Sequence, residues 1–476
     1  MNLYNFLLEH SQDNPDKPYC YTHEETITYG QLCQRAEQLA GQLCGDPQLA
    51  QTSLVAVSSD DNFLLLHLVW ACLRAGICLA FLPASSDSAE LKKLMSQIGA
   101  TVLLTDRPNL QPAPWIKNIH LTTHVKIAGA QSHSLPPLPT VPSAPAFIFQ
   151  TSGTTGTAKW VQVTQAQYVL AIKQMQLSGG LDHASNQVVY NTLPLSHSYG
   201  LSSLLEYTAC GATIMLPQAT SSLGAVGTLL APKMATRITA IEGVSHFYSQ
   251  MVRLLGRIHL PNLRHIGFGG GAIQHSLIDR LQQVFPTLTY SIRYGLTETP
   301  SVVTHKRFAP PYTDDWNASG RVLPIYTLKI VDQTGQCVPD GEEGEILIKG
   351  ACLAWPYYGE PASNDFFATG DIGYLNSQQE LCLIGRKSSF LKIHGYRISP
   401  AYIESLIDSF DAVLASRVSA ENDLISAEII PAFPTATPQA IQAYLTDKLP
   451  NYAIPTTLHF VEKIPRTASG KIKRLC

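Results

Sequence analysis

Residues 53–83 constrain the fold more than any other part of this sequence. They read SLVAVSSDDNFLLLHLVWACLRAGICLAFLP, and the apolar part from Phe63 approaches the length of a membrane-spanning helix. His67, Arg74 and Gly76 interrupt that part, so a buried helix up to Arg74, a turn at Gly76 and a buried strand explain it better. Strand, helix and strand in this order are typical of a parallel α/β fold. We therefore expect an α/β domain and no integral membrane segment.

The alternation of apolar strands and amphipathic helices continues along most of the chain. Residues 27–43, ITYGQLCQRAEQLAGQL, predict a helix that begins with a capping box of Thr28 and Gln31. Residues 187–217 and 263–285 each repeat the strand–helix order. The fold class is therefore α/β, with a large N-terminal domain of parallel or mixed sheets and helices.

Three later segments differ from this alternation. Residues 107–145 are irregular, with LPPLPTVPSAP towards their end, and predict a linker. Residues 321–349 predict a small β-rich section, because short strands alternate with turns at DQTG and PDGEEG. A compact tail follows, in which Ser399 is expected to cap a helix. We therefore expect a core domain of residues 1–386 and a small α+β C-terminal domain of residues 387–476.

The composition excludes some function classes. The chain of 476 residues has 33 basic and 36 acidic residues and a net charge of −3. It therefore lacks the overall positive charge that attracts nucleic acid. Its ten cysteines include no C-x-x-C pair, which favours free thiols in a reducing compartment over a zinc site. The first residues, MNLYNFLLEHSQDNPDK, lack a basic region followed by a long apolar run. We expect a cytoplasmic protein without a signal peptide.

The stretch IFQTSGTTGTAKWVQVT, which begins at Ile148, concentrates hydroxyls, glycines and a lysine between two β-prone runs. Backbone N–H groups freed of side chains form an anion-binding nest, so this loop predicts a phosphate site. It is not a Walker loop, because Ala158 and Trp160 stand where that motif has a glycine and a serine or threonine.

Four further stretches are weak signals when taken singly. They are FGGGAI at residues 268–273, YGLTE at residues 294–298, FFATGDIGYL with Asp371 in a tight turn, and PRTASGKIKR with Lys471. Each alone could be an ordinary turn or a solvated tail. The phosphate loop, YGLTE, TGD, the GRK at residues 385–387 with a later glycine, and the C-terminal GK occur in this order, and this set resembles the adenylate-forming superfamily of acyl-CoA synthetases, nonribosomal peptide adenylation domains and beetle luciferases. The resemblance covers nearly the whole chain.

The resemblance implies an enzyme that activates a carboxylic acid with ATP and Mg²⁺. The products would be an acyl-adenylate and pyrophosphate, and the acyl group would then pass to the thiol of CoA or of a phosphopantetheinyl carrier protein. The resemblance also assigns nucleotide-binding residues. These are Thr151, Ser152, Gly153, Thr154, Thr155, Gly156 and Lys159 for the phosphates, Gly270, Gly271, Ala272, Tyr294 and Gly295 for adenine, and Asp371 and Arg386 for ribose.

The implied catalytic residues suit this chemistry. A carboxylate that attacks an α-phosphate brings two anions together, so the barrier is largely electrostatic and cations lower it. No general base is needed, because the acid is already ionised at neutral pH. The C-terminal domain would rotate between the two steps. The residues implied are Thr297 at the α-phosphate, Glu298 at Mg²⁺, Lys471 and then Lys392 at the reacting group, His197 at the thiol entrance, and Ser388 as the hinge.

The substrate is predicted less sharply than the reaction. Amino-acid-activating relatives carry an aspartate where Ser198 stands, so an ordinary α-amino acid is not expected. Gly267 and Gly269 suggest room for an elongated or aromatic acid. Arg293 either points into the pocket, where it could bind a second polar or anionic group, or lies outward on the surface. The predicted pocket consists of His197, Ser198, Tyr199, Gly267, Gly269, Arg293 and Ser301.

Several alternatives stay open at this point. His197 could instead cap a helix or be buried. Trp160, which replaces a common glycine, could loosen the phosphate loop or pack on the neighbouring strand. The chain ends five residues after Lys471, which suits a CoA ligase, a domain of a larger assembly or the partner of a free carrier protein. Three other functions also stay open: adenylation of an unusual amino acid, a luciferase-like oxygenase reaction, and nucleotide binding without catalysis.

Overall fold

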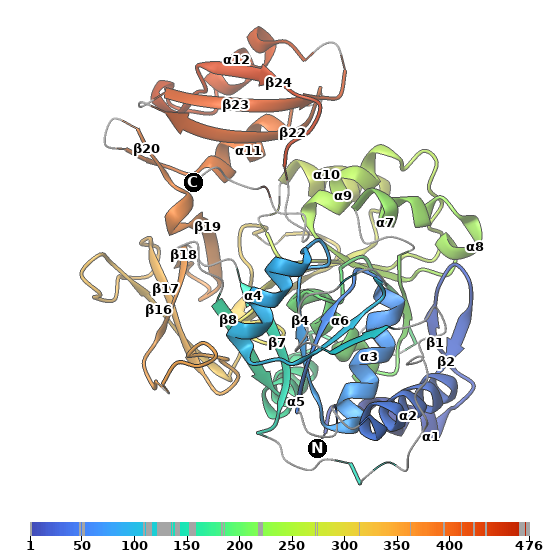
Figure 1. Cartoon of the computed structure of the whole chain (residues 1–476). Helices are drawn as coiled ribbons and strands as arrows, with labels where there is room; N and C mark the ends of the chain where they lie inside the picture. Colours follow the sequence, from blue (N-terminus) through green and yellow to red (C-terminus); the bar gives the residue numbers. More distant parts are fainter. Residues whose placement is uncertain are drawn as a thin grey trace.

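The computed structural model consists of a large N-terminal region and a small C-terminal domain, drawn in orange to red above it in Figure 1. The described residues are 2–46, 49, 53–107, 110, 117–120, 135, 137–138, 143–151, 159–181, 184, 186–217, 222–271, 273, 275–313, 315–361, 363–393, 396–410, 412–421, 424–433, 436–465 and 472.

The segment at residues 53–83 forms the predicted strand, helix and strand. Asp61 caps the helix, because its carboxylate accepts hydrogen bonds from two backbone N–H groups of the first turn. Gly76 ends it with a φ of 74°, in the left-handed region that favours glycine. Among the described residues, no helix is long and apolar enough to cross a membrane. The elements are β3 (Leu54–Ser58), α3 (Asn62–Ala75) and β4 (Cys78–Phe81).

These strands lie in a sheet with the order β6-β5-β3-β4-β7-β8. Its strands are parallel except for β8, which pairs antiparallel to β7. The predicted linker at residues 107–145 was therefore wrong in part, since it contains strand β6. The other elements are α4 (Ser88–Ile98), β5 (Val102–Thr105), β6 (Lys117–His120), β7 (Pro145–Thr151), β8 (Lys159–Thr164) and α5 (Gln165–Leu177).

A second sheet has the order β15-β14-β13-β12-β11-β9-β10-β1-β2. Strands β9 (Val188–Asn191), β11 (Ala240–Gly243), β12 (His265–Phe268) and β13 (Thr289–Tyr294) are parallel neighbours, so their carboxyl ends meet at one edge of the sheet. Ligands of parallel α/β sheets bind at this edge. The remaining elements are α1 (Tyr4–Asp13), β1 (Pro18–Tyr21), β2 (Thr26–Thr28), α2 (Tyr29–Gly45), α6 (Ser198–Ala209), β10 (Thr213–Met215), α7 (Ser222–Leu229), α8 (Pro232–Ala235), α9 (Ser245–Arg253), α10 (His275–Val284), β14 (Thr304–Phe308) and β15 (Arg321–Val322).

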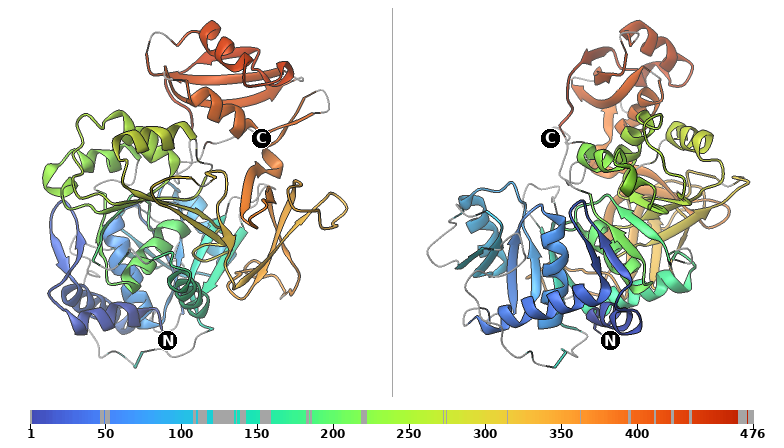
Figure 2. Two further views of the ribbon diagram at one scale, coloured as in Figure 1. Left: turned by 180° about the vertical axis from the view of Figure 1, so that it is seen from behind. Right: turned by 90° about the vertical axis from the view of Figure 1, so that its right-hand side faces the viewer.

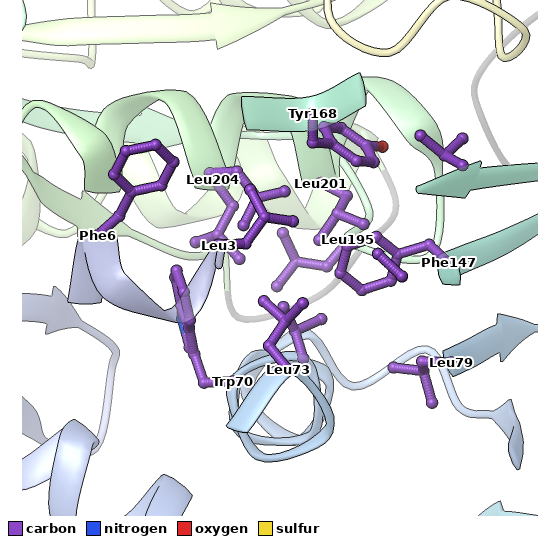
Figure 3. Close-up of a cluster of buried hydrophobic side chains, with 14 of the residues drawn as sticks. Leu3, Phe6, Trp70, Leu73, Leu79, Phe147, Tyr168, Leu195, Leu201 and Leu204 are labelled. Atoms are coloured by element: carbon purple, nitrogen blue, oxygen red, sulfur yellow. The ribbon is translucent and has the colours of Figure 1, made fainter. Parts of the chain in front are cut away.

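The main core explains why α3 is apolar on all sides. Figure 3 shows Trp70 and Leu73 of α3 pointing towards Leu201 and Leu204 of α6, and all four side chains are buried. A helix enclosed in this way needs no polar face. Each such side chain contributes about 1.5–3 kcal/mol by its burial. The predicted capping box of α2 is confirmed as well.

The β-rich section is larger than the predicted residues 321–349. It is an antiparallel sheet in the order β16-β17-β18-β19. Asp371 was expected in a tight turn, but it lies inside β18, next to Gly370 with its φ of 72° and close to a register shift. An irregular strand of this kind resembles a turn in sequence. The strands are β16 (Tyr326–Val331), β17 (Gly344–Gly350), β18 (Phe367–Leu375) and β19 (Leu381–Arg386).

The C-terminal domain has its own hydrophobic core. Ser399 caps α11 as predicted, by accepting a hydrogen bond from a backbone N–H. Figure 2 shows this domain near α9 of the large region, and the Nη2 of Arg253 donates a 2.7 Å hydrogen bond to the carbonyl of Leu414. The elements are η2 (Lys387–Ser389), β20 (Leu391–Ile393), β21 (Tyr396–Ile398), α11 (Pro400–Asp408), β22 (Val413–Glu421), β23 (Leu424–Pro431), α12 (Pro438–Thr446), η3 (Asn451–Ala453) and β24 (Thr457–Phe460).

Candidate active site

The predicted phosphate loop joins the hairpin strands β7 and β8. Its first and last residues, Thr151 and Lys159, are directly opposite in the antiparallel register. Trp160 is 5% exposed and packs in a core cluster, where its Nε1 donates to Gln97 at 2.9 Å. Trp160 lies in the same buried cluster as Ile148 of the neighbouring strand β7, in agreement with the interpretation that it packs on that strand. The predicted loop residues Ser152, Gly153, Thr154, Thr155 and Gly156 lie outside the described residues.

Tyr357 connects Lys159 with Glu298. The Nζ of Lys159 lies 4.5 Å from the centre of the Tyr357 ring, a cation–π contact. The Tyr357 hydroxyl donates a 2.9 Å hydrogen bond to Oε1 of Glu298. Burial raises the pKa of Tyr357, so the hydroxyl keeps its proton. Sequence reasoning missed this residue, because PYYGE carries no periodic signal and Tyr357 is 59 residues from Glu298.

The residues at Glu298 suit a magnesium ion held jointly with a nucleotide. Among the described residues, no group of three or more His, Cys, Asp or Glu side chains could hold a metal ion alone. Glu298 is 7% exposed, and its carboxylate is oriented by Tyr357. Mg²⁺ at nucleotide sites commonly binds one or two carboxylates together with phosphates and waters. A single oriented carboxylate therefore fits this ion.

Three predicted nucleoside residues lie together where β13 meets the β16–β19 sheet. The hydroxyl of Tyr294 donates to Oδ2 of Asp371 at 2.8 Å. Nε of Arg386 is 2.9 Å from Oδ1 of the same carboxylate, and the two residues are opposite each other on β18 and β19. Burial, followed by the nearby carboxylate, raises the pKa of Tyr294. Asp371 is thus held between a phenol and a guanidinium.

The glycine turn after β12 contains part of the predicted adenine site. Gly270 has a φ of 75°, so a side chain there would be strained. A Cβ on Gly271 would meet no heavy atom within 4 Å. Ala272 lies outside the described residues, whereas Gly295 follows Tyr294 directly after β13.

Gly267 and Gly269 do not open the pocket in the way expected. A Cβ on Gly269 would lie 2.6 Å from the ring of Tyr199, and one on Gly267 would lie 2.3 Å from Oε2 of Glu242. The space left by the missing side chains is filled by Tyr199 and Glu242. The prediction of additional room for an elongated acid is therefore wrong.

The first turn of α6 brings two more predicted residues to the strand ends. Oγ of Ser198 lies 3.4 Å from Oγ1 of Thr297. His197 occupies the N-cap position, but its half-buried side chain makes no capping hydrogen bond. The structure therefore supports neither alternative for His197, that its side chain caps the helix or that it is fully buried.

Arg293 neither lies on the surface nor presents a free guanidinium to the pocket. Its side chain is 2% exposed, its Nη1 donates to Glu206 at 2.6 Å, and its Nη2 lies 3.3 Å from Glu242. The prediction that it binds an anionic group of the substrate conflicts with this pairing, because two carboxylates already flank the guanidinium. The alternative of an outward surface arginine is also wrong.

The predicted residues of the C-terminal domain are only partly described. Ser388 lies in the short turn η2, directly after β19. Lys392 is in β20, but its side chain and the whole of Lys471 lie outside the described residues. Their roles remain predictions, as does the domain boundary at residues 386 and 387.

Comparison with known proteins yields two family matches along the chain. Residues 7–358 match the model for AMP-binding enzymes, and residues 402–471 match the model for the C-terminal domain of AMP-binding enzymes. The 2-succinylbenzoate–CoA ligase of Bacillus licheniformis is 26% identical over 485 residues, which cover 99% of this chain and 98% of the relative.

Solved structures agree in fold. O-succinylbenzoate coenzyme A synthetase from Bacillus subtilis, in complex with AMP, has a TM-score of 0.82 at 24% identity and covers 98% of this chain and 96% of its own. A benzoate CoA ligase from Burkholderia xenovorans LB400 has a TM-score of 0.84 at 20% identity, with 99% of both chains covered. The chain therefore belongs to the AMP-binding enzyme family and is an ATP-dependent, AMP-forming acid–thiol ligase.

Proposed function

We propose that this enzyme is an aryl-acid–CoA ligase. The observation that carries the proposal is the hydroxyl pair of Ser198, at the start of α6, and Thr297, in the turn after β13, which lie 3.4 Å apart. An α-ammonium group would need a carboxylate near the reacting end of the substrate, and Ser198 supplies a neutral hydroxyl instead. Similarity to ligases that are named for aromatic acids and for CoA supports the same choice.

The proposed roles follow from charge. Lys159 would meet the distal phosphates of ATP, and Thr297 the α-phosphate. Mg²⁺, held by Glu298 and the phosphates, would supply positive charge where negative charge develops. Asp371 would hold the ribose hydroxyls. Lys471 would stabilise the α-phosphate as the acid attacks it.

The second step would use the same site with a different lysine. The adenylate releases AMP when a thiol attacks its carbonyl, and Lys392 would take the place of Lys471 after the C-terminal domain rotates. His197, half-buried at the start of α6, would line the entrance for the thiol. A carrier protein is the alternative acceptor that the sequence leaves open, and a cytoplasmic location is proposed from the sequence as well.

Pyrophosphate exchange with a panel of benzoic, cinnamic, fatty and proteinogenic amino acids tests the proposal. We expect exchange with at least one aromatic acid and background rates with all amino acids. Thioester formation should then be measured with CoA and, separately, with phosphopantetheinylated carrier proteins. Robust exchange with a single α-amino acid, or transfer only to a carrier protein, would refute the corresponding half of the proposal.

A further inference from the structure

A cluster of buried polar side chains lies beneath the predicted acid pocket, between α6 and the parallel strands. It comprises Glu206 and Tyr207 from α6, Glu242 from β11 and Arg293 from β13, and all four are buried. The Tyr207 hydroxyl donates to Oε1 of Glu242 at 2.6 Å, beside the guanidinium. Replacing such a cluster with apolar groups is often neutral or stabilising, so stability alone does not account for it.

Two further residues, Tyr199 and Ser301, hydrogen-bond to the carboxylates of this cluster through their hydroxyls. Tyr199 donates to Oε2 of Glu242 at 2.9 Å, and Ser301 makes a short hydrogen bond to Oε1 of Glu206. Both residues are only partly buried, unlike the four beneath them. Ser301 has a φ of 68°, a strained value for serine that is typical of functional sites. Tyr199 and Ser301 are therefore the residues of this hydrogen-bonded group that solvent reaches.

The direction of these hydrogen bonds decides what the hydroxyls can bind. A hydroxyl has one proton and can also accept a hydrogen bond. Tyr199 directs its proton to Glu242, and burial raises its pKa, so it stays protonated. Only the lone pairs of its oxygen remain for a ligand. A group that meets Tyr199 must accordingly donate a hydrogen bond.

The charge of the cluster points the same way. Two carboxylates face one guanidinium, so the cluster is negative when all three groups are ionised. Burial raises the pKa of Glu206, which brings the charge nearer to zero but never makes it positive. Nε and Nη2 of Arg293 make no hydrogen bond to the described residues, and both atoms are buried. A second carboxylate on the substrate would find repulsion here.

We propose that the substrate acid carries a hydrogen-bond donor, a hydroxyl or an amino group, at the end remote from its reacting carboxylate, and that Tyr199 accepts this hydrogen bond. The Tyr199 ring fills the space beside Gly269, while Ser198 holds the reacting end near Thr297. This inference rests on the proposed function and narrows it to hydroxy- or amino-substituted acids. Dicarboxylates are excluded.

The test compares acids in matched trios: unsubstituted, with a remote hydroxyl, and with a second carboxylate. Benzoate, 4-hydroxybenzoate and terephthalate form one trio; hexanoate, 6-hydroxyhexanoate and adipate form another. We expect kcat/KM for pyrophosphate exchange to favour the hydroxy acid over the unsubstituted acid by about tenfold, the effect of one hydrogen bond. The dicarboxylate should be the poorest member of its trio.

Two variants locate the effect. Tyr199→Phe keeps the ring and removes the acceptor, so the preference for the hydroxy acid should fall by about tenfold, through KM. Tyr207→Phe is the matched control, because it removes a hydroxyl hydrogen bond of 2.6 Å to the other oxygen of the same Glu242 carboxylate, and Tyr207 is buried. It should leave the ratio between the two acids unchanged. Circular dichroism confirms that both variants are folded.

The outcomes separate this inference from the proposed function. Exchange with the fatty-acid trio alone would refute the aromatic substrate, yet the hydroxy acid of that trio should still be preferred. A dicarboxylate that matches or exceeds the hydroxy acid would overturn the inference. So would a preference for the hydroxy acid that Tyr199→Phe and Tyr207→Phe reduce equally.

Discussion

The Tyr357→Phe variant tests whether the hydroxyl that orients Glu298 contributes to adenylation. It removes the 2.9 Å hydrogen bond to the carboxylate and keeps the aromatic ring beside Lys159. A hydrogen bond to a charged group contributes about 1.5–3 kcal/mol. If this contribution is made in the transition state, the rate of adenylation should fall by about 10- to 150-fold.

The assay measures the two half-reactions separately. Pyrophosphate exchange, recorded at several Mg²⁺ concentrations, should show the loss and a higher requirement for the ion. Thioester formation from a pre-formed acyl-adenylate should be nearly unchanged, because neither pyrophosphate nor its metal takes part. Tyr358→Phe is a suitable control, since its hydroxyl donates to the carbonyl of Ile98 and not to Glu298.

A double-mutant cycle with Glu298→Gln tests the pairing itself. If the hydroxyl acts through the carboxylate, the second substitution should add little to the first. Exchange rates within twofold of the unmodified enzyme would refute the reasoning, as would an equal loss in both half-reactions.

Three further predictions concern the C-terminal domain and the core. Lys471→Ala should reduce adenylation by about 10²–10³ and spare transfer from pre-formed adenylate; equal losses in the two assays would contradict its role. Ser388→Pro should preserve adenylation and abolish overall turnover, because proline fixes φ near about −65° and so blocks the rotation of the C-terminal domain. The short turn η2 accepts this φ, so the variant should still fold. Normal turnover in a folded variant would show that the hinge is not at Ser388. Burial lowers the pKa of His67 from 6.5 to about 4, so its contribution to stability is complete above pH 6.5 and is lost as the pH falls towards 4, by about 3 kcal/mol in total. Denaturant unfolding of His67→Gln and the unmodified enzyme across this range should show a smaller loss for the variant, and identical pH profiles would disprove the assignment.

Local patterns in the sequence were sufficient to predict many elements of the fold. The capping box of Thr28 and Gln31 and the N-cap of Ser399 involve residues within one helical turn, so neighbouring residue types determine them. The break at Gly76 is equally local. The order of the five motifs along the chain identified the family, because together they are specific even though each is weak alone.

The same patterns failed where an element depends on pairing with another strand. Strand β6 exists because it pairs with β5, and β18 is a strand because β17 and β19 flank it. Their own residues resemble a linker and a turn. Strand assignment depends on pairing partners outside the strand itself, which the residues of one strand do not reveal.

The character of the acid pocket was decided only by the tertiary structure. The sequence contains Gly267, Gly269 and Arg293, but not the fact that Tyr199 and Glu242 fill the space beside the glycines. Arg293 is 87 residues from its partner Glu206, and Tyr357 is 59 residues from Glu298. Whether a charged side chain binds a substrate or another side chain depends on what folding brings within about 3 Å of it. Residue types therefore determined the chemistry available to this chain, and the packing of α6 against the parallel strands decided which of those groups remain for a substrate.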